Sequence, residues 1–179
     1  MDIYKLKFTS LEQEIFSLLC KRAGEKLSQR EIAKLLDVSP TAVSKSLRKL
    51  LEKNLAQVEK TKNINFVSLN RDEQKAIELK RVENLKQIYL SGLSDYLLNN
   101  LAGSTIILFG SYSNGEDTLN SDIDIAVIER KEKPVQLDKY EKILNRNLHL
   151  LFFESWKKIN KHLKNNILNG IILHGSVVL

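Results

Sequence analysis

Residues 110–125 carry the sequence GSYSNGEDTLNSDIDI, and this polar stretch joins two apolar segments. The segments 105–109 and 122–128 have the composition of buried strands. Gly110 lets the backbone turn tightly at the end of the first strand and come close to a ligand. Ser111 offers a hydroxyl and a backbone amide at the start of a short helical turn, where a polyphosphate could bind.

Asp122 and Asp124 lie two residues apart in an extended segment, so both carboxylates are expected to project from one face. Two neighbouring carboxylates repel each other unless a cation lies between them. Mg²⁺ is a hard cation that binds carboxylate oxygens together with substrate phosphates. A pair of such ions can stabilise the attacking and leaving oxygens of an in-line displacement. The pattern therefore predicts a metal site suited to nucleotidyl transfer from a nucleoside triphosphate.

The rest of the second half alternates between helical and strand patterns. Helices are predicted over 135–145 and 155–168, and a strand over 148–153. This order predicts an α/β unit with a mixed sheet. Glu116 and Asp117 lie in the polar loop, where they are expected to solvate the turn.

The Gly-Ser pair followed by Asp-x-Asp resembles the motif of the DNA polymerase beta-like nucleotidyltransferase superfamily, and within it the minimal nucleotidyltransferases. Residues 80–179 fit that compact domain. The resemblance implies that Gly110 and Ser111 hold the triphosphate and that Asp122 and Asp124 are catalytic residues that hold Mg²⁺. It further implies ATP or another nucleoside triphosphate as substrate, with release of pyrophosphate.

Related enzymes present a third carboxylate from the strand after the next helix, where it helps to hold metal or to activate the acceptor hydroxyl. Here that position holds His149, which could serve as a base or a metal ligand when neutral. Glu154 is nearby but lies on the opposite alternation, so it needs a bulge or bend to reach the site. This departure from the family pattern leaves open a catalytically inactive domain.

Three helical patterns open the chain, and each begins at a serine that can cap it. Leu35 is expected on the buried stripe of the second helix, beside Ile32 and Leu36. The capping serines and the residues that support them are Ser10 with Gln13, Ser28 with Glu31, and Ser39 with Pro40.

The outer side of the third helix carries short hydroxyls and basic side chains, which can reach base edges and phosphates. After this helix the period changes to alternation, which predicts strands over 55–60 and 64–69 around a turn that ends at Asn63. Lys60 and Lys62 are expected at the hairpin tip, where they can contact backbone phosphate. The candidate DNA-binding residues are Thr41, Ser44, Lys45, Arg48, Lys60 and Lys62.

Residues 10–70, including SQREIAKLLDVSPTAVSKSLRKLLEKNLAQVE, resemble the winged-helix transcription regulators. The resemblance implies binding of double-stranded DNA through the third helix and the wing. The alternative is a protein-interaction module with the same fold. Winged-helix regulators commonly bind pseudo-palindromic sites as dimers. The helical segment that follows could therefore support a homodimer, or it could simply link the two domains.

Charge and length agree with this organisation. The chain has 179 residues, 42% of them hydrophobic, and a net charge of +6. Residues 1–70 carry 13 Lys and Arg against 8 Asp and Glu, or +5, and the remainder carries 15 against 14, or +1. This asymmetry indicates a polyanion as partner of the first third. The longest apolar runs are far below the ~20 residues of a membrane span, and residues 1–5 do not begin a signal peptide, so we expect a cytoplasmic protein.

The predicted fold class is α+β, with a winged-helix DNA-binding domain over 1–70, a linking helical segment over 71–101 that can break at Ser91-Gly92, and a minimal nucleotidyltransferase domain over 102–179. By family resemblance the acceptor of the nucleotidyl group is a protein, such as a cognate toxin neutralised by an antitoxin. One alternative is a transcription regulator whose second domain is inactive and binds nucleotide or forms a dimer interface. The other is transfer to a small molecule or to RNA.

Overall fold

The computed structural model describes residues 7–62 and 64–178. The chain divides into two compact units, Met1–Lys80 and Arg81–Leu179. The division falls inside helix α4 (Gln74–Leu90), so the end of α4 and all of α5 (Leu93–Asn100) belong to the same unit as the C-terminal sheet. No helix in the described part of the chain combines the length and the apolar character that crossing a bilayer requires.

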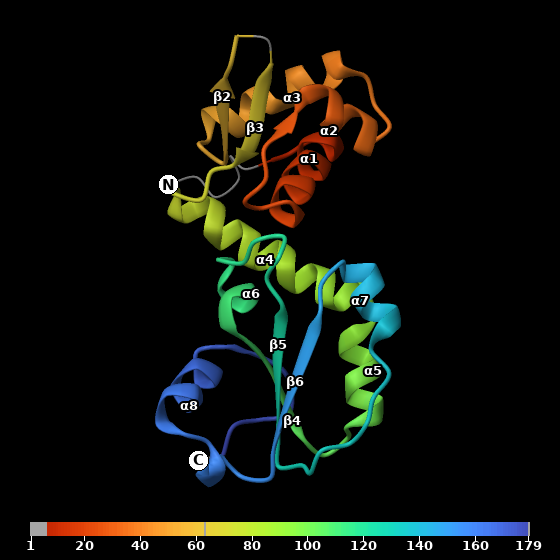
Figure 1. Cartoon of the computed structure of the whole chain (residues 1–179), viewed down its shortest axis with the longest axis vertical. Helices are drawn as coiled ribbons and strands as arrows, with labels where there is room; N and C mark the ends of the chain where they lie inside the picture. Colours follow the sequence, from red (N-terminus) through yellow and green to blue (C-terminus); the bar gives the residue numbers. More distant parts are fainter. Residues whose placement is uncertain (1–6, 63, 179) are drawn as a thin grey trace. The chain divides into compact units, whose positions relative to one another are not determined.

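The first unit is a winged helix, as predicted (Figure 1). A three-stranded antiparallel sheet of order β1-β3-β2 packs against its helices. Its elements are α1 (Ser10–Lys21), β1 (Leu27–Ser28), α2 (Gln29–Leu35), α3 (Pro40–Glu52), β2 (Ala56–Lys60) and β3 (Asn65–Leu69). The short strand β1, which pairs Leu27 with Val67, was not predicted because two residues carry no readable alternation. Asn63, which was placed at the end of the turn, lies outside the described residues.

Helices α2 and α3 begin where their capping residues predict. The Ser28 hydroxyl accepts the Glu31 amide at 3.2 Å and the Glu31 carboxylate accepts the Ser28 amide at 2.7 Å, which is a complete capping box. The Ser39 hydroxyl accepts the Ala42 amide at 3.2 Å, with Pro40 at the first helical position.

The predicted cap of α1 was wrong by one residue. Thr9 is the N-cap, and its partner in the capping box is Glu12 rather than Gln13. The Glu12 carboxylate accepts the Thr9 amide at 2.8 Å, and a carboxylate accepts such a bond more strongly than the neutral amide of a glutamine. Ser10 is the first helical residue, and its hydroxyl donates to Glu14.

One predicted core residue of the first unit was also wrong. Leu35 is 48% exposed, whereas Ile32 is fully buried. Helix α2 ends at Leu35, and the side chains that pack into the core beside Ile32 are Ala33 and Leu36. Leu36, which was predicted on the same stripe, does pack against the core, so only one of the two neighbouring leucines faces it at the end of a helix of seven residues.

The second unit is built on a mixed sheet, as predicted, and the order of its strands is β6-β5-β4-β7. Strand β5 is parallel to β6 and antiparallel to β4, and β4 is antiparallel to β7. The strands are β4 (Thr105–Phe109), β5 (Ile123–Ile128), β6 (Leu148–Phe153) and β7 (Ile171–His174).

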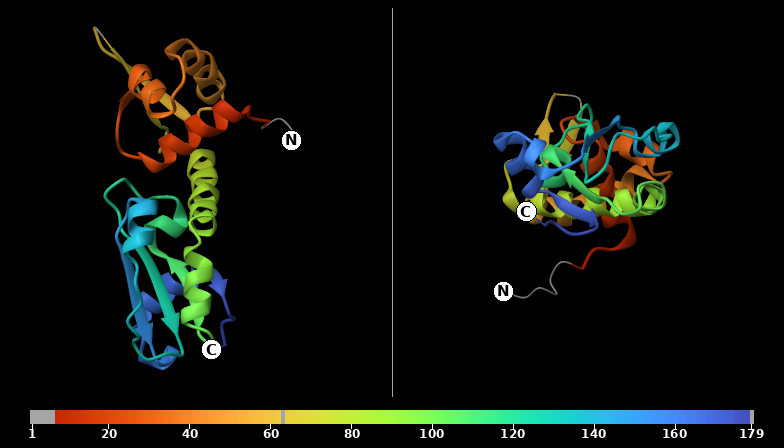
Figure 2. Two further views of the ribbon diagram at one scale, coloured as in Figure 1. Left: turned by 90° about the vertical axis from the view of Figure 1, so that its right-hand side faces the viewer. Right: turned by 90° about the horizontal axis from the view of Figure 1, so that it is seen from below.

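Helices cover both faces of this sheet (Figures 1 and 2). On one face, α5 and α7 (Asp138–Leu144) pack against alternate residues of β4 and β5, with Leu97 and Tyr140 in the shared core. On the other face, η2 (Trp156–Lys158) and α8 (Lys161–Leu168) cover the opposite alternation through Trp156 and Ile167. The period-two burial of the strands therefore has a helical layer on each side.

Two predicted helices differ in their bounds, and one predicted break is confirmed. The segment 155–168 forms two elements, because the Asn160 side chain accepts the Leu163 amide at 2.9 Å and starts α8 anew. Helix α7 begins at Asp138 rather than near residue 135. The predicted break at Ser91-Gly92 is confirmed, and Gly92 adopts φ 76° between α4 and α5 (Figure 2).

Candidate functional site

The residues singled out in the Gly-Ser and Asp-x-Asp segments meet at one edge of the C-terminal sheet. Strand β4 ends there, and β5 and β6 begin there. Phe109 pairs with Asp124 across β4 and β5, and Asp124 pairs with His149 across β5 and β6. Gly110 follows Phe109 directly, so the turn after β4, the Asp-x-Asp segment and His149 are neighbours.

Gly110 opens the short helix α6 (Gly110–Asn114) in a left-handed conformation, with φ 74°. A Cβ at this position would lie 2.7 Å from Oδ2 of Asp124. Any side chain would therefore clash with the carboxylate as well as strain the backbone. Ser111, the second residue of α6, is half-buried, and its carbonyl accepts the Glu116 amide at 3.0 Å. The glycine brings this turn against the Asp-x-Asp segment.

Asp122 and Asp124 both face His149. Nδ1 of His149 lies 3.7 Å from Oδ2 of Asp122 and 3.7 Å from Oδ1 of Asp124. Asn147, which was not predicted, donates from its side-chain amide to Oδ1 of Asp122 at 3.0 Å. Asp122 precedes the first residue of β5, and its contact with His149 places it on the same side of the strand as Asp124.

The carboxyl of Asp124 is electrostatically perturbed. Partial burial raises its pKa above 3.8, His149 opposes this shift, and the neighbouring carboxylate of Asp122 raises the pKa further. Ionisation of Asp124 is thus less favourable in the protein alone than it is for a free aspartate side chain. A bound cation would remove this penalty.

Glu154 is not brought to this site. It follows the last residue of β6, and Phe153 pairs with Ile128 at the opposite end of β5 from Asp124. Its carboxylate forms an exposed ion pair with Lys158 one helical turn later. The bulge that Glu154 needed does not occur, because β6 pairs with β5 in unbroken register.

The donor set fits a hard divalent cation that arrives with a phosphorylated substrate. Among residues 7–62 and 64–178, no three His, Cys, Asp and Glu side chains form a ready-made metal cluster. Mg²⁺ characteristically needs only one or two protein carboxylates, with substrate phosphates and water completing its shell. The two aspartates supply those oxygens, and glycine at position 110 avoids a Cβ that would lie 2.7 Å from Oδ2 of Asp124.

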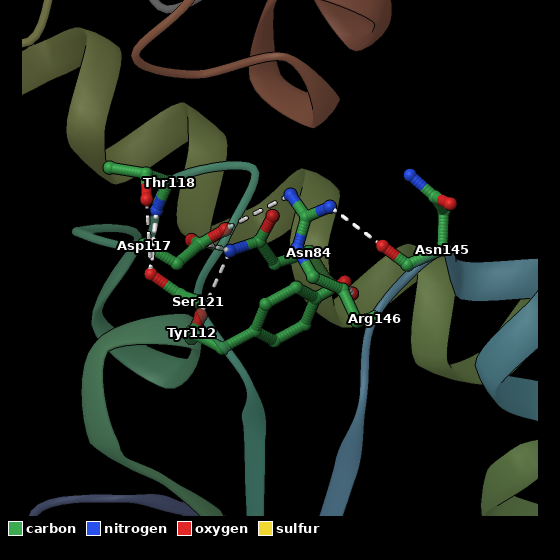
Figure 3. Close-up of polar contacts among 7 residues, drawn as sticks. All are labelled: Asn84, Tyr112, Asp117, Thr118, Ser121, Asn145 and Arg146. Atoms are coloured by element: carbon green, nitrogen blue, oxygen red, sulfur yellow. Dashed lines mark hydrogen bonds and ion pairs between the residues drawn. The ribbon is translucent and has the colours of Figure 1, made fainter.

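A buried polar network lies behind the site (Figure 3). The Asn84 side chain on α4 donates to the Tyr112 carbonyl at 2.9 Å and to Oδ1 of Asp117 at 2.7 Å. Asp117 is 1% exposed, and the guanidinium of Arg146 lies 3.8 Å from its Oδ2. The prediction that Asp117 solvates the turn was therefore wrong. Its buried carboxylate instead connects the loop after α6 to α4 and to the residues that follow α7.

The same loop then closes into a tight turn before Asp122. The Thr118 amide donates to the Ser121 hydroxyl at 3.0 Å, and the Ser121 amide donates to the Thr118 carbonyl at 3.1 Å (Figure 3). Arg146 also donates to the Asn145 carbonyl at 2.9 Å. The sequence did not indicate the contacts of Asp117 with Asn84 and Arg146, because they join residues far apart in the chain.

A cleft of about 570 Å³ opens beside Asp122, between this turn and α7. Its lining is polar and of mixed charge, and its charged residues are Asp122, Asp138, Glu141, Lys142 and Arg146. Glu141 accepts the Leu148 amide at 2.9 Å. The cleft is on the β6 side of Asp122, whereas Gly110 and Ser111 follow β4 on the other side of β5.

The candidate nucleic-acid interface lies on the first unit. On α3, Thr41, Lys45 and Arg48 are exposed and Ser44 is half-buried. In the hairpin, Lys60 ends β2 and pairs with Asn65, and both Lys60 and Lys62 are exposed. Thr61 closes the tip, because its hydroxyl donates to the Ile64 carbonyl at 2.6 Å and accepts the Ile64 amide at 3.1 Å.

Comparison with known families agrees with both units. Residues 90–174 match the model of the nucleotidyltransferase domain, and residues 15–63 match that of the MarR family. No curated protein matches the chain.

Several solved structures are similar over part of the chain. ZitR from Lactococcus lactis, wild type in complex with DNA, shares 26% identity, with 53% of this chain and 63% of that chain covered and a TM-score of 0.41. The adhesin competence repressor AdcR from Streptococcus pyogenes shares 18% identity, with 57% and 72% covered and a TM-score of 0.43. MepR from a multidrug resistant S. aureus clinical isolate shares 20% identity, with 56% and 70% covered and a TM-score of 0.41.

The family models fall on the two compact units that the structure separates, the MarR model on the three helices and the first strand of the wing and the nucleotidyltransferase model on the mixed sheet with its Asp-x-Asp edge. The chain therefore joins a winged-helix domain of the MarR type to a nucleotidyltransferase domain.

Proposed function

We propose that the second domain transfers a nucleotidyl group, AMP from ATP, to a hydroxyl group of a protein acceptor, and that the first domain binds double-stranded DNA. The observation that carries the enzymatic part is the convergence of Asp122 and Asp124 on one side chain, His149, directly beside Gly110. This edge combines a glycine turn that lies against Asp124 with two ligands for a divalent cation.

In this proposal Gly110 and Ser111 bind the triphosphate and Asp122 and Asp124 hold Mg²⁺. The cation, when bound, neutralises phosphate charge. Transfer forms a bond between the acceptor oxygen and the α-phosphorus and breaks the bond to pyrophosphate. The hydroxyl proton is released to solvent. Asn147 orients Asp122 through its 3.0 Å hydrogen bond, and the Asn84–Asp117 contact keeps the loop before Asp122 in place.

The cleft beside Asp122 supports a protein acceptor. It lies on the side of Asp122 away from Gly110, so an acceptor there and a triphosphate at Gly110 would approach the aspartates from opposite sides. Three carboxylates and two basic side chains line it. A polycationic drug would favour an acidic lining and RNA a basic one, whereas a segment of a folded protein, such as a toxin, carries both charges.

DNA binding is supported by the exposed hydroxyl and basic side chains of α3 and by the two lysines of the wing. The N-terminal third holds +5 of the net charge of +6. A MarR-type domain of this charge fits a role in regulating its own operon. We place Thr41 and Ser44 near base edges and Lys45, Arg48, Lys60 and Lys62 near phosphates.

The second candidate is a regulator in which the nucleotidyltransferase domain binds nucleotide without turnover. The observation that favours it is the imidazole of His149 at the place where related enzymes present a third carboxylate. Both candidates predict nucleotide binding, but only the first predicts a covalent product.

The two candidates are separated by labelling in parallel with ATP carrying ³²P at the α- or the γ-phosphate. The full chain is incubated with Mg²⁺ and the proteins that co-purify with it from its native cell. Label from the α-position alone, lost in Asp122→Asn and Asp124→Asn, supports nucleotidyl transfer. Absence of α-label, with an operator shift that responds to ATP, supports the regulator instead.

A further inference from the structure

The position of His149 between the two aspartates carries a consequence for the choice of metal. Its Nδ1 is equally far, 3.7 Å, from a carboxylate oxygen of Asp122 and one of Asp124. Its register partner on β5 is Asp124, so the strand pairing fixes its backbone at the site. More than half of its side-chain surface is exposed, at 56%, so the ring is free to adjust.

These two spacings from Nδ1 of His149 are compatible with ligands that share one ion. Ligands at about 2.1 Å from a metal in octahedral geometry are about 3 Å apart when adjacent and about 4.2 Å apart when opposite. The 3.7 Å contacts lie between these values. A small rotation of the exposed ring would bring Nδ1 within bonding distance of an ion held by both aspartates. As placed in the described part of the chain, these three side chains do not by themselves form a group that holds a metal ion, so the ring has to turn toward the ion and phosphate oxygens of the nucleotide complete the shell.

We propose that His149 is a third protein ligand of the nucleotide-bound metal and makes the site prefer Mn²⁺ or another borderline divalent ion over Mg²⁺. The inference rests on the proposed function, because it takes the Asp122 and Asp124 site as the metal site. Imidazole is a poor ligand for Mg²⁺, which favours oxygen donors, and a good ligand for first-row transition metals. Replacing an oxygen donor with a nitrogen donor therefore shifts the metal preference without changing the reaction.

The alternative role of His149 is that of a counter-ion, in which a protonated ring neutralises the two carboxylates and is displaced by any cation. The two roles differ in a spectroscopic property. A directly bound imidazole nitrogen couples magnetically to Mn²⁺ and is seen by electron spin-echo envelope modulation. A displaced imidazolium gives no such coupling.

The test uses Mn²⁺ with the full chain and a non-hydrolysable ATP analogue, without turnover. We expect ¹⁴N coupling in the parent and in His162→Asn, an exposed histidine on α8 that serves as the matched control. The coupling should disappear in His149→Asn, with Mn²⁺ affinity reduced about tenfold, the scale of losing one supporting group at a metal site. His149→Asp should bind Mn²⁺ without ¹⁴N coupling and gain affinity for Mg²⁺ relative to Mn²⁺.

Two results overturn the inference and are distinguishable from each other. Mn²⁺ binding that needs Asp122 and Asp124 but shows no ¹⁴N coupling in the parent removes His149 as a ligand and leaves the proposed function in place. Mn²⁺ binding that Asp122→Asn and Asp124→Asn do not weaken removes the metal site itself, and the proposed function with it.

Discussion

Gly110 and Asp124 are in such close apposition that a Cβ on the glycine would lie 2.7 Å from the carboxylate oxygen Oδ2. Gly110→Ala should therefore lower the free energy of unfolding by about 1–3 kcal/mol, because Gly110 also adopts φ 74°. It should also abolish binding of a metal–nucleotide pair, since the Asp124 side chain must move. Urea unfolding and titration with a fluorescent ATP analogue measure the two effects.

Gly103→Ala is the matched control for that prediction. Gly103 has a similar φ of 85°, but a Cβ there would meet no atom within 4 Å. Gly103→Ala should lose only the stability that the strained backbone conformation costs, and it should bind nucleotide as the parent does. Equal nucleotide affinity in Gly110→Ala and Gly103→Ala would show that the apposition has no part in binding.

The local signals in the sequence predicted local structure well. Ser28 and Ser39 start their helices as predicted because a cap depends on three or four consecutive residues. The strand pattern before Gly110 and the one that contains Asp124 likewise predicted β4 and β5. Errors arose where two neighbouring residues had equal claims to the same role, as a helix cap or as a core position. Leu35 and Leu36 were both predicted in the core, but only Leu36 packs there, in a helix too short to fix its phase.

Long-range partners could not be predicted in this way. The contact of Asn84 with Asp117 joins residues 33 positions apart, and neither residue has a periodicity or motif that indicates the other. His149 was assigned to the site by family resemblance, and strand register now places it beside Asp124. Glu154 is only five residues after His149 in the sequence, but it lies at the other end of β6 from the site.

Truncating Asn84 should destabilise the second domain. Asn84→Ala removes the donor that satisfies Oδ1 of buried Asp117 and the Tyr112 carbonyl, which costs about 1–3 kcal/mol for each buried group left without its bond. Thermal unfolding measures the loss. Asn99→Ala, at an exposed position of α5, should stay within about 0.5 kcal/mol of the parent. Two variants of equal stability would mean that the network does not hold the loop.

Removing the charge of Asp124 should stabilise the metal-free protein at neutral pH. The pKa of Asp124 is raised in the folded state, so the folded protein retains a proton that the unfolded chain has already lost. The stability contributed by this group therefore falls as pH rises from 3.8 through the folded-state pKa, and the deficit persists above it.

Asp124→Asn should consequently unfold at a higher temperature than the parent at pH 7 in the presence of a chelator. The difference should shrink towards pH 3.5, where the Asp124 carboxyl of the parent is mostly protonated in both the folded and the unfolded state. Paired melting curves across this range measure it. A difference that is constant with pH would assign the stabilisation to something other than ionisation. Saturating Mg²⁺ with nucleotide should reverse the order at pH 7, because only the parent binds the ion.

The basic residues of α3 should contribute to DNA affinity through phosphate. Lys45→Ala and Arg48→Ala are each expected to reduce the slope of log K against log salt by about one, because one fewer counterion is released. Fluorescence anisotropy with operator DNA at several salt concentrations gives the slope. Lys21→Ala, an exposed lysine at the end of α1, should retain the parent slope. Unchanged slopes in all three variants would place the DNA elsewhere.

The central claim is that Asp122 and Asp124 jointly hold the cation that accompanies the nucleotide. Crystals of the full chain grown with Mn²⁺ and a non-hydrolysable ATP analogue, measured at the manganese absorption edge, test it without an acceptor. The account predicts an anomalous peak within bonding distance of both carboxylates, with the analogue's phosphates beside Gly110. A well-bound nucleotide whose metal lies away from the two aspartates would contradict it.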